Sequence, residues 1–173
     1  MAEPVTSAAD LFEARLRQML AVESKLADEV LPRLLREAHS TDLRFAFERH
    51  IAETQGHVEI VRELVSELGV RAEAEQSPAL EALVTEHDRL LERVGEAETV
   101  ASDLVHAMAA AATEHLEMAS YDMLATLADA LGRESAAVRL RELFEQEELA
   151  LELVDRAVTK LLAEEVESAP HAT

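Results

Sequence analysis

Apolar residues recur along most of the chain at steps of three and four, the spacing that places them on one face of an α-helix. Capping residues divide this pattern into segments: Ser7 with Asp10, and Ser40 before the next apolar run, are typical helix N-termini. Gly69 and Gly132 suit the left-handed conformation that ends many helices. The pattern predicts helices over about residues 7–39, 40–69, 78–94, 98–131 and 135–166, followed by a disordered tail over residues 167–173.

The connections between these helices indicate how they pack. Tight turns join the first long helix to the second and the third long helix to the last, so each pair should form an antiparallel hairpin. Residues 70–77 link the hairpins, and Ser77-Pro78 opens the short helix within this crossover. A long crossover lets the second and third long helices run parallel, as in ferritin-like bundles. We therefore expect an all-α, ferritin-like antiparallel four-helix bundle of two helical hairpins, forming one domain over residues 1–166, with a kink at Pro32.

Composition restricts the chemistry that such a bundle could perform. The chain has no cysteine, so disulfides and thiolate metal sites are excluded, and any metal must bind carboxylate or imidazole. The formal net charge of −20 disfavours nucleic acid and anionic membranes as partners. The N-terminal residues lack the basic start and apolar run of a secretory signal, and no apolar stretch is long enough to span a bilayer. We expect a cytoplasmic protein.

Acidic residues interrupt three of the apolar stripes. Glu23 in the first long helix and Glu147 in the last each lie near the middle of an otherwise apolar series. Glu114 interrupts the stripe of the third long helix, and Glu117 and Tyr121 follow at intervals of about one turn. A lone ionised carboxylate in such a position would cost several kcal/mol, in order-of-magnitude terms. These glutamates must therefore be protonated, paired with a cation, or bound to metal.

The second long helix adds imidazoles to these carboxylates. His50, Glu53 and His57 share one face, because they lie within about 60° of one another at 100° per residue. His57 is the better ligand candidate. His50 either binds in its place or orients a carboxylate from the outer shell. Tyr121 is a further candidate for the outer shell. Glu23 and Glu53 are 30 residues apart, as are Glu117 and Glu147, so hairpins of equal length would bring them to one level. The candidate metal ligands are Glu23, Glu53, His57, Glu114, Glu117 and Glu147.

Ligands rich in oxygen suit two ions of iron or manganese, and they also tolerate zinc. The pattern departs from the strict di-iron signature, in which Glu-x-x-His occurs on two helices. His57 follows Glu53 at the fourth position and not the third, and the residues one turn after Glu147 are Ala150 and Leu151. One of the two metals is therefore expected to lack a nitrogen ligand.

These stretches resemble the YciE/YciF family of ferritin-like bacterial stress proteins. The resemblance implies a ferritin-like bundle, a homodimer, a di-metal site on the six candidate ligands and an association with stress responses, but no defined reaction. The residues that carry it are LFEARLRQMLAVESKLADEVLPRLL (11–35), FERHIAETQGHVEIVRELVSELG (47–69), TEHLEMASYDMLATLADALG (113–132) and LFEQEELALELV (143–154).

Three functions are compatible with these observations. The first is a di-iron or di-manganese protein that handles dioxygen, peroxide or Fe(II), as an enzyme or without turnover. The second is a non-enzymatic bundle whose acids bind a structural metal, or pair with Arg15, Lys25 or Arg49 without one. The third is an acidic module that binds a basic partner through its surface.

Overall fold

Helices make up all the regular structure that the computed structural model describes, over residues 5–69, 75–95 and 99–168. The predicted all-α fold is therefore confirmed. The elements are α1 (Ala8–Lys25), the π-helical turn η1 (Leu26–Val30), α2 (Leu31–Glu37), α3 (Thr41–Glu67), α4 (Pro78–Val94), α5 (Val100–Ala130) and α6 (Glu134–Ser168).

The predicted caps set most of the helix ends. The Ser7 hydroxyl accepts a hydrogen bond from the Asp10 N–H, and the Asp10 carboxylate accepts one from the Ser7 N–H, which forms a capping box at α1. Gly69 and Gly132 adopt positive φ angles of 72° and 69° where α3 and α5 end. The last helix, α6, runs to Ser168, so the first two residues of the expected tail are helical. The rest of that tail, and residues 70–74 of the expected linker, lie outside the described residues.

Pro32 interrupts the first long helix in a different way from a simple kink. Proline donates no backbone hydrogen bond, and its ring collides with the carbonyl four residues earlier in a regular α-helix. The chain accommodates it by widening into the π-helical turn η1 directly before the proline, with the Leu31 N–H donating to the Leu26 carbonyl. Glu23 lies one turn before this irregular segment. Single π-helical turns of this kind often occur beside functional sites.

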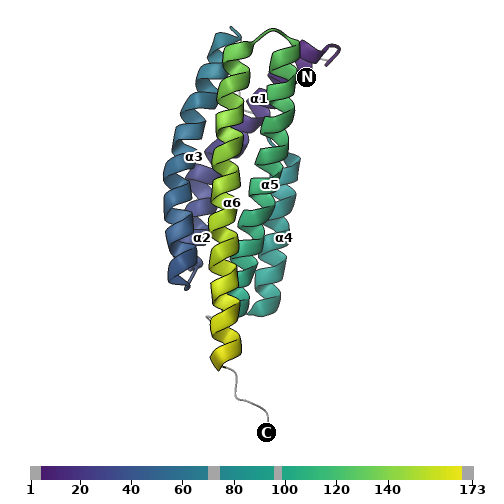
Figure 1. The fold of residues 1–173 in the computed structure, drawn as a ribbon. Coiled ribbons are helices and arrows are strands. Elements are labelled where there is room, and N and C mark those ends of the chain that lie inside the picture. The colour runs from purple at the N-terminus through teal and green to yellow at the C-terminus, as the bar shows by residue number, and fades with distance from the viewer. Residues whose placement is uncertain (1–4, 70–74, 96–98, 169–173) are drawn as a thin grey trace.

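The long helices lie side by side as a bundle (Figure 1). In this view α1, α2 and α6 run downward, whereas α3 and α5 run upward, so the second and third long helices are parallel as expected. The α1 helix packs on α3 and α5, and α6 packs on the same two helices. Apolar side chains from all of these helices form one buried core, including Leu16, Phe47, Leu124 and Leu140. No helix in the described part of the chain is both long and apolar enough to pass through a membrane.

The short helix α4 packs outside the long helices, against α5 (Figure 1). One ion pair ties it to α1, where Lys25 Nζ lies 2.5 Å from Glu81 Oε1. A second ties it to α2, where Arg33 Nη1 lies 2.6 Å from Asp88 Oδ1. Because α4 covers a second face of α5, polar residues that the stripe pattern leaves outside the core, such as His106 and Thr113, are buried. This second buried face was not predicted.

One buried carboxylate has a structural role. Asp103 is only 3% exposed, and its two carboxylate oxygens each accept a backbone hydrogen bond of 2.8 Å, from the N–H groups of His39 and Ser40. The side chain therefore ties the start of α5 to the turn between α2 and α3. Its oxygens are fully engaged, unlike those of the glutamates described next.

Candidate metal centre

Six ionisable side chains meet in the middle of the bundle. Each is no more than 4% exposed, and together they come from α1, α3, α5 and α6. The side chains form two groups. Within each group, one nitrogen or oxygen atom from every side chain lies within 4.8 Å of the corresponding atoms of the others, and Glu147 belongs to both groups. The first group is Glu23, His57 and Glu147, and the second is His50, Glu114, Glu117 and Glu147.

The first group is centred on His57. Its Nδ1 atom lies 2.8 Å from Glu147 Oε1 and 3.6 Å from Glu23 Oε2. The other ring nitrogen, Nε2, lies 2.9 Å from the side-chain oxygen of Gln146. An Nε2–H donated to this oxygen leaves Nδ1 as the nitrogen that faces the carboxylates. Gln146 therefore orients the ring, a role that the sequence analysis did not identify.

The second group is centred on His50. Its Nε2 atom lies 3.1 Å from Glu114 Oε1 and 3.7 Å from Glu147 Oε2. The two oxygens of Glu147 thus face different imidazoles, Oε1 toward His57 and Oε2 toward His50. A carboxylate presented in this way can bridge two cations.

These close approaches lack the usual geometry of hydrogen bonds. Both oxygens of Glu114, Glu117 and Glu147 are buried without a hydrogen-bond partner, and so are His57 Nδ1 and both ring nitrogens of His50. Most buried polar atoms in proteins do have partners. Two ligands that bind one metal at right angles, with bonds of about 2.1 Å, lie about 3.0 Å apart. The contacts of His57 with Glu147 at 2.8 Å and of His50 with Glu114 at 3.1 Å are close to that separation.

Glu23 reaches the cluster with one oxygen engaged elsewhere. The hydroxyl of Tyr121, which is fully buried, donates a hydrogen bond to Glu23 Oε1. Glu23 Oε2 has no hydrogen-bond partner and faces His57. The hydrogen bond from Tyr121 therefore leaves one oxygen of Glu23 without a partner, and the outer-shell role of the tyrosine stays a prediction.

Protonation offsets the crowding of negative charge when the cluster holds no metal. Burial and the charges of Glu147, Glu23 and Glu114 raise the pKa of Glu117 well above its ordinary value. Burial raises the pKa of Glu147 to about 8, although contact with His57 opposes the rise. Burial alone would lower the pKa of His57, but the carboxylates of Glu147 and Glu23 outweigh it and raise the pKa to about 10. The cluster therefore takes up protons that a metal ion would displace.

The metal-free protein is expected to lose stability as the pH rises. The pKa of Glu147 is about 8 in the folded protein against 4.5 as a free group, and that of His57 about 10 against 6.5. Over these ranges the folded state binds more protons than the unfolded state, so the free energy of unfolding falls with rising pH. Urea unfolding in the presence of a chelator should show a loss of several kcal/mol, on the order of 5, between about pH 6 and about pH 9. Metal-loaded protein is the control, because bound metal keeps Glu147 and His57 deprotonated. Equal stability of the metal-free protein at both pH values would contradict this account.

The structure brings together five of the six candidate ligands. These are Glu23, His57, Glu114, Glu117 and Glu147. Glu53 differs from the expectation: it is partly exposed, belongs to neither group, and accepts a 2.8 Å hydrogen bond from Arg49 Nε. Glu53 Oε2 lies 3.9 Å from His50 Nδ1, whereas the other ring nitrogen, Nε2, faces Glu114. His50 therefore belongs to a group of candidate ligands, whereas Glu53 lies beside its ring and outside both groups.

The two histidines occupy different groups because of their spacing. Seven residues are almost two helical turns, so His50 and His57 point in nearly the same direction about 10 Å apart along α3. Each group therefore receives one imidazole. The sequence predicted a nitrogen ligand at one metal only, whereas each of these two groups contains one histidine.

A second pair of buried histidines lies outside the two groups. His87 Nε2 on α4 lies 3.0 Å from His106 Nδ1 on α5, and His87 Nδ1 lies 3.2 Å from Asp88 Oδ1. This pair could not be predicted from the sequence, because one histidine lies on α4 and the other on the face of α5 that α4 covers. His87 continues the apolar series of α4 that includes Leu80 and Val84, which is the only signal in the sequence that it is buried.

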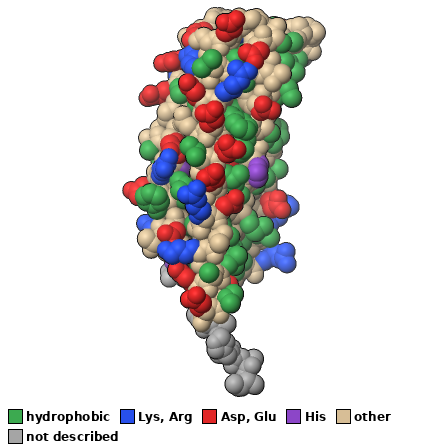
Figure 2. All heavy atoms as spheres, viewed as in Figure 1, with side chains coloured by type: hydrophobic (Ala, Val, Ile, Leu, Met, Phe, Trp, Pro, Cys, Tyr) green, Lys and Arg blue, Asp and Glu red, His purple; other side chains and the backbone are tan. Residues whose placement is uncertain are grey.

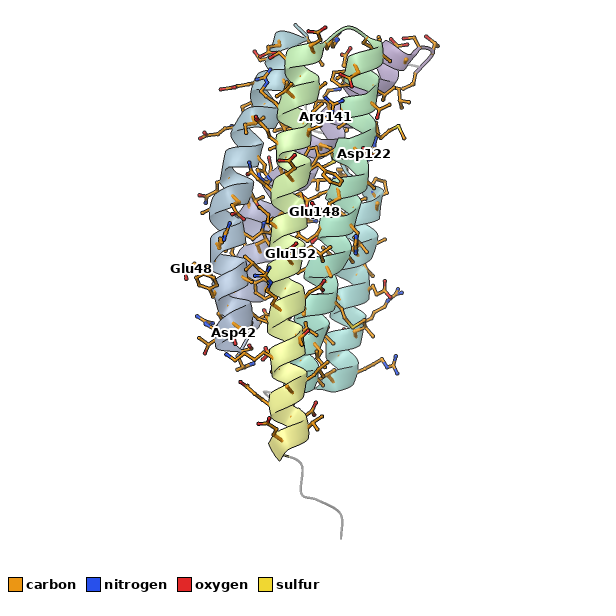
Figure 3. The ribbon with its side chains drawn as sticks, viewed as in Figure 1. Asp42, Glu48, Asp122, Arg141, Glu148 and Glu152 are labelled. Carbon is orange, nitrogen blue, oxygen red and sulfur yellow. The ribbon has the colours of Figure 1, made fainter. Side chains whose placement is uncertain are left out.

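The exposed acids near the cluster show how selective the burial is. Figure 3 labels Glu48, Glu148 and Glu152, which lie on the outer surfaces of α3 and α6. All three are exposed, although Glu148 directly follows Glu147 in the chain. The glutamates of the cluster are thus set apart by position and not by residue type.

The fold and the cluster define a class of protein: an all-helical bundle with buried carboxylates and imidazoles grouped at its centre. The chain belongs to the family described as "Domain of unknown function (DUF892)", whose model matches residues 7–167.

Known relatives match most of the chain in sequence and in structure. The chain is 32% identical over 154 residues to Protein YciF of Escherichia coli (strain K12), a match that covers 88% of this chain and 91% of that protein. The crystal structure of the E. coli stress protein YciF matches with a TM-score of 0.83 and 28% identity, covering 92% of this chain and 99% of that one. YcfI of Rhodopseudomonas palustris, described as a candidate structural protein, matches with a TM-score of 0.81 and 26% identity, covering 90% and 97%. The predicted resemblance to the YciE/YciF family is therefore confirmed.

Proposed function

We propose that this chain is a ferritin-like di-metal protein of the stress response that binds two ions of iron or manganese at the centre of its bundle. Glu23 and His57 would bind one ion, and His50, Glu114 and Glu117 would bind the other. Glu147 would bridge the two ions. Glu53, Gln146 and Tyr121 would hold ligands in place without binding metal themselves.

The observation that carries this proposal is the set of buried ligand atoms without hydrogen-bond partners, arranged around one shared carboxylate. A cluster of ion pairs would use its protons in hydrogen bonds, whereas these atoms face each other at ligand-to-ligand distances. Charge supports the same conclusion. The four carboxylates of the two groups carry four negative charges when ionised, which two divalent cations neutralise.

The donor set favours iron or manganese. Each group offers one imidazole and at least two carboxylates, with no thiolate in the chain. Hard oxygen ligands with some nitrogen suit these two metals, and zinc is the main competitor. Iron or manganese bound there would supply the redox chemistry that dioxygen, peroxide or Fe(II) requires. The chain's own residues would set the geometry and exclude bulk water, because every ligand is buried.

Metal analysis of protein purified without a chelator tests this function. We expect about two transition-metal ions per chain, followed by Fe(II) oxidation or peroxide consumption when the protein is loaded with iron or manganese. Fewer than about one bound ion per chain after loading would contradict the proposal. Bound metal without turnover would support a metal site that has a structural role.

The main alternative is a metal-free structural bundle. It is favoured by the contacts of His50 with Glu114 and of His57 with Glu147, which could act as ion pairs when the imidazoles are protonated. The description of the R. palustris relative as a candidate structural protein points the same way. In this alternative, chelators would leave the stability of the purified protein unchanged.

The acidic surface gives less support to a third function. Figure 2 shows acidic side chains spread over the visible face, with lysine and arginine side chains among them. Several of these acids are paired, including Asp42 with Lys160 and Glu152 with Arg156. No acidic patch stands out on this face as a docking site for a basic partner. The homodimer expected from the family resemblance remains part of the proposal, and sedimentation in solution would test it.

A further inference from the structure

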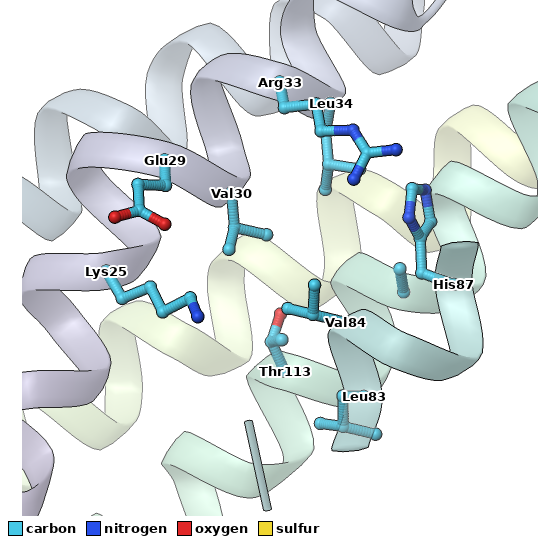
Figure 4. A pocket seen from close by; sticks show the side chains of 10 residues that line it. Lys25, Glu29, Val30, Arg33, Leu34, Leu83, Val84, His87 and Thr113 are labelled. Atoms are coloured by element: carbon cyan, nitrogen blue, oxygen red, sulfur yellow. The ribbon is translucent and has the colours of Figure 1, made fainter. Parts of the chain in front are cut away.

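A pocket of about 140 Å³ opens between α4, α5 and the stretch of chain from the end of α1 through η1 to α2 (Figure 4). Its walls are mostly apolar and include Val30, Leu34, Val84 and Ala109. A cavity of this size holds a molecule as large as benzene, so it has ample room for dioxygen or hydrogen peroxide. The pocket lies outside the two groups of metal ligands.

The pocket exists because α4 bridges a gap that it does not fill. The ion pair of Lys25 with Glu81 holds α4 to α1, and the ion pair of Arg33 with Asp88 holds it to α2. Lys25 and Arg33 both line the pocket. Figure 4 shows Val30 between Lys25 and Arg33, with Val84 and Thr113 facing them from α4 and α5. Across the pocket, α5 presents the small side chain of Ala109. Larger side chains there would pack better, so the cavity reduces the stability of the fold.

One residue of the pocket lining, Thr113, lies near the candidate metal centre along α5. Thr113, which is buried, lines the pocket and directly precedes Glu114. It also lies four residues before Glu117, so the two side chains are neighbours on one face of α5. The hydroxyl of Thr113 donates to the Ala110 carbonyl at 2.7 Å and is thereby turned toward its own helix.

We propose that this pocket is the entry route and holding site for a small uncharged reactant of the two-metal centre, with Thr113 as the last side chain before the ligands. The inference rests on the proposed function, because it assigns a path to that same centre. Apolar walls admit neutral molecules of the size of dioxygen or hydrogen peroxide. They exclude ions, which would lose hydration on entry, and larger organic molecules, which would not fit.

Filling the pocket tests the route without touching a ligand. Ala109→Leu places a larger side chain in the pocket from α5, and Val84→Phe does so from α4. Ala119→Leu is the matched control, because Ala119 lies on the exposed face of the same helix. The probe is nitric oxide, a neutral diatomic molecule, mixed with Fe(II)-loaded protein in stopped flow. Crystals of each variant under xenon pressure provide a readout that does not depend on metal.

We expect xenon in the pocket of the wild-type protein and of the Ala119→Leu control, and none in the two filled variants. Formation of the iron–nitrosyl adduct should slow at least about tenfold in the filled variants, with bound iron and final absorbance unchanged. Equal rates in all four proteins, or a wild-type pocket without xenon, would overturn the entry route while leaving the metal centre standing. A wild-type protein that binds no iron would instead refute the proposed function, and the route with it.

Discussion

Replacing Glu147 with glutamine is expected to weaken metal binding strongly at both positions of the centre. Glu147 presents one oxygen to His57 and the other to His50, and it is the residue shared by the two groups of ligands. Glutamine keeps the shape of the side chain but removes the charge and one oxygen ligand. We expect the affinity for Fe(II) or Mn(II) to fall by at least about 100-fold at both positions, as measured by equilibrium dialysis with metal analysis.

Two comparisons make this result specific. Glu148→Gln alters the next residue, which is exposed, and should bind metal as the wild-type protein does. Glu23→Gln should weaken only the position beside His57, because Glu23 belongs to one group. A Glu147→Gln variant that still binds two ions with wild-type affinity would exclude the bridging role.

Replacing Glu117 with methionine is expected to stabilise the metal-free protein while weakening its binding of metal. Glu117 is fully buried, neither of its oxygens has a hydrogen-bond partner, and burial together with neighbouring carboxylates raises its pKa. Methionine has a similar length and needs no partner. We expect the free energy of unfolding without metal to rise by about 1–3 kcal/mol, measured by urea denaturation in chelator.

The same substitution at an exposed glutamate separates this effect from a general effect of methionine. Glu48→Met on the outer surface of α3 should change the stability by less than about 0.5 kcal/mol. If Glu117→Met instead destabilised the metal-free protein, Glu117 would have a structural role in the absence of metal. The metal-free alternative would then gain support.

These two predictions describe one trade-off. Carboxylates collected in an apolar core reduce the stability of the metal-free bundle, and protonation or metal binding offsets that cost. Asp103 shows the contrast, because its two oxygens accept backbone hydrogen bonds and its burial is compensated within the fold. The cluster lacks such compensation from the protein alone.

The helices could be predicted from the sequence because their signals are local. Capping residues, glycines and apolar spacing depend on a few neighbouring residues, and Ser7, Gly69 and Gly132 perform the expected roles. The interrupted stripes likewise identified the buried glutamates Glu23 and Glu147, since a charged residue in an apolar series is conspicuous without knowledge of the packing.

The remaining parts of the site depend on contacts between distant segments. The docking of α4 on α5 buries His106 and Thr113 and forms the pocket, and no pattern within α5 shows where a fifth helix will pack. The assignment of His50 over Glu53 depends on a rotation of about 60° around α3 and on Arg49, which engages Glu53 at the surface. Gln146 orients His57 from another helix, a contact that lies 89 residues away in the chain.

Anomalous diffraction from crystals of protein purified without a chelator, measured on both sides of the iron and manganese absorption edges, tests the central claim most directly. The account predicts two peaks within the bundle, one beside Glu23 and His57 and one beside His50 and Glu114, with Glu147 between them. Crystals grown from iron-loaded protein that show no peak among these side chains, with His57 and Glu147 in direct contact, would contradict it.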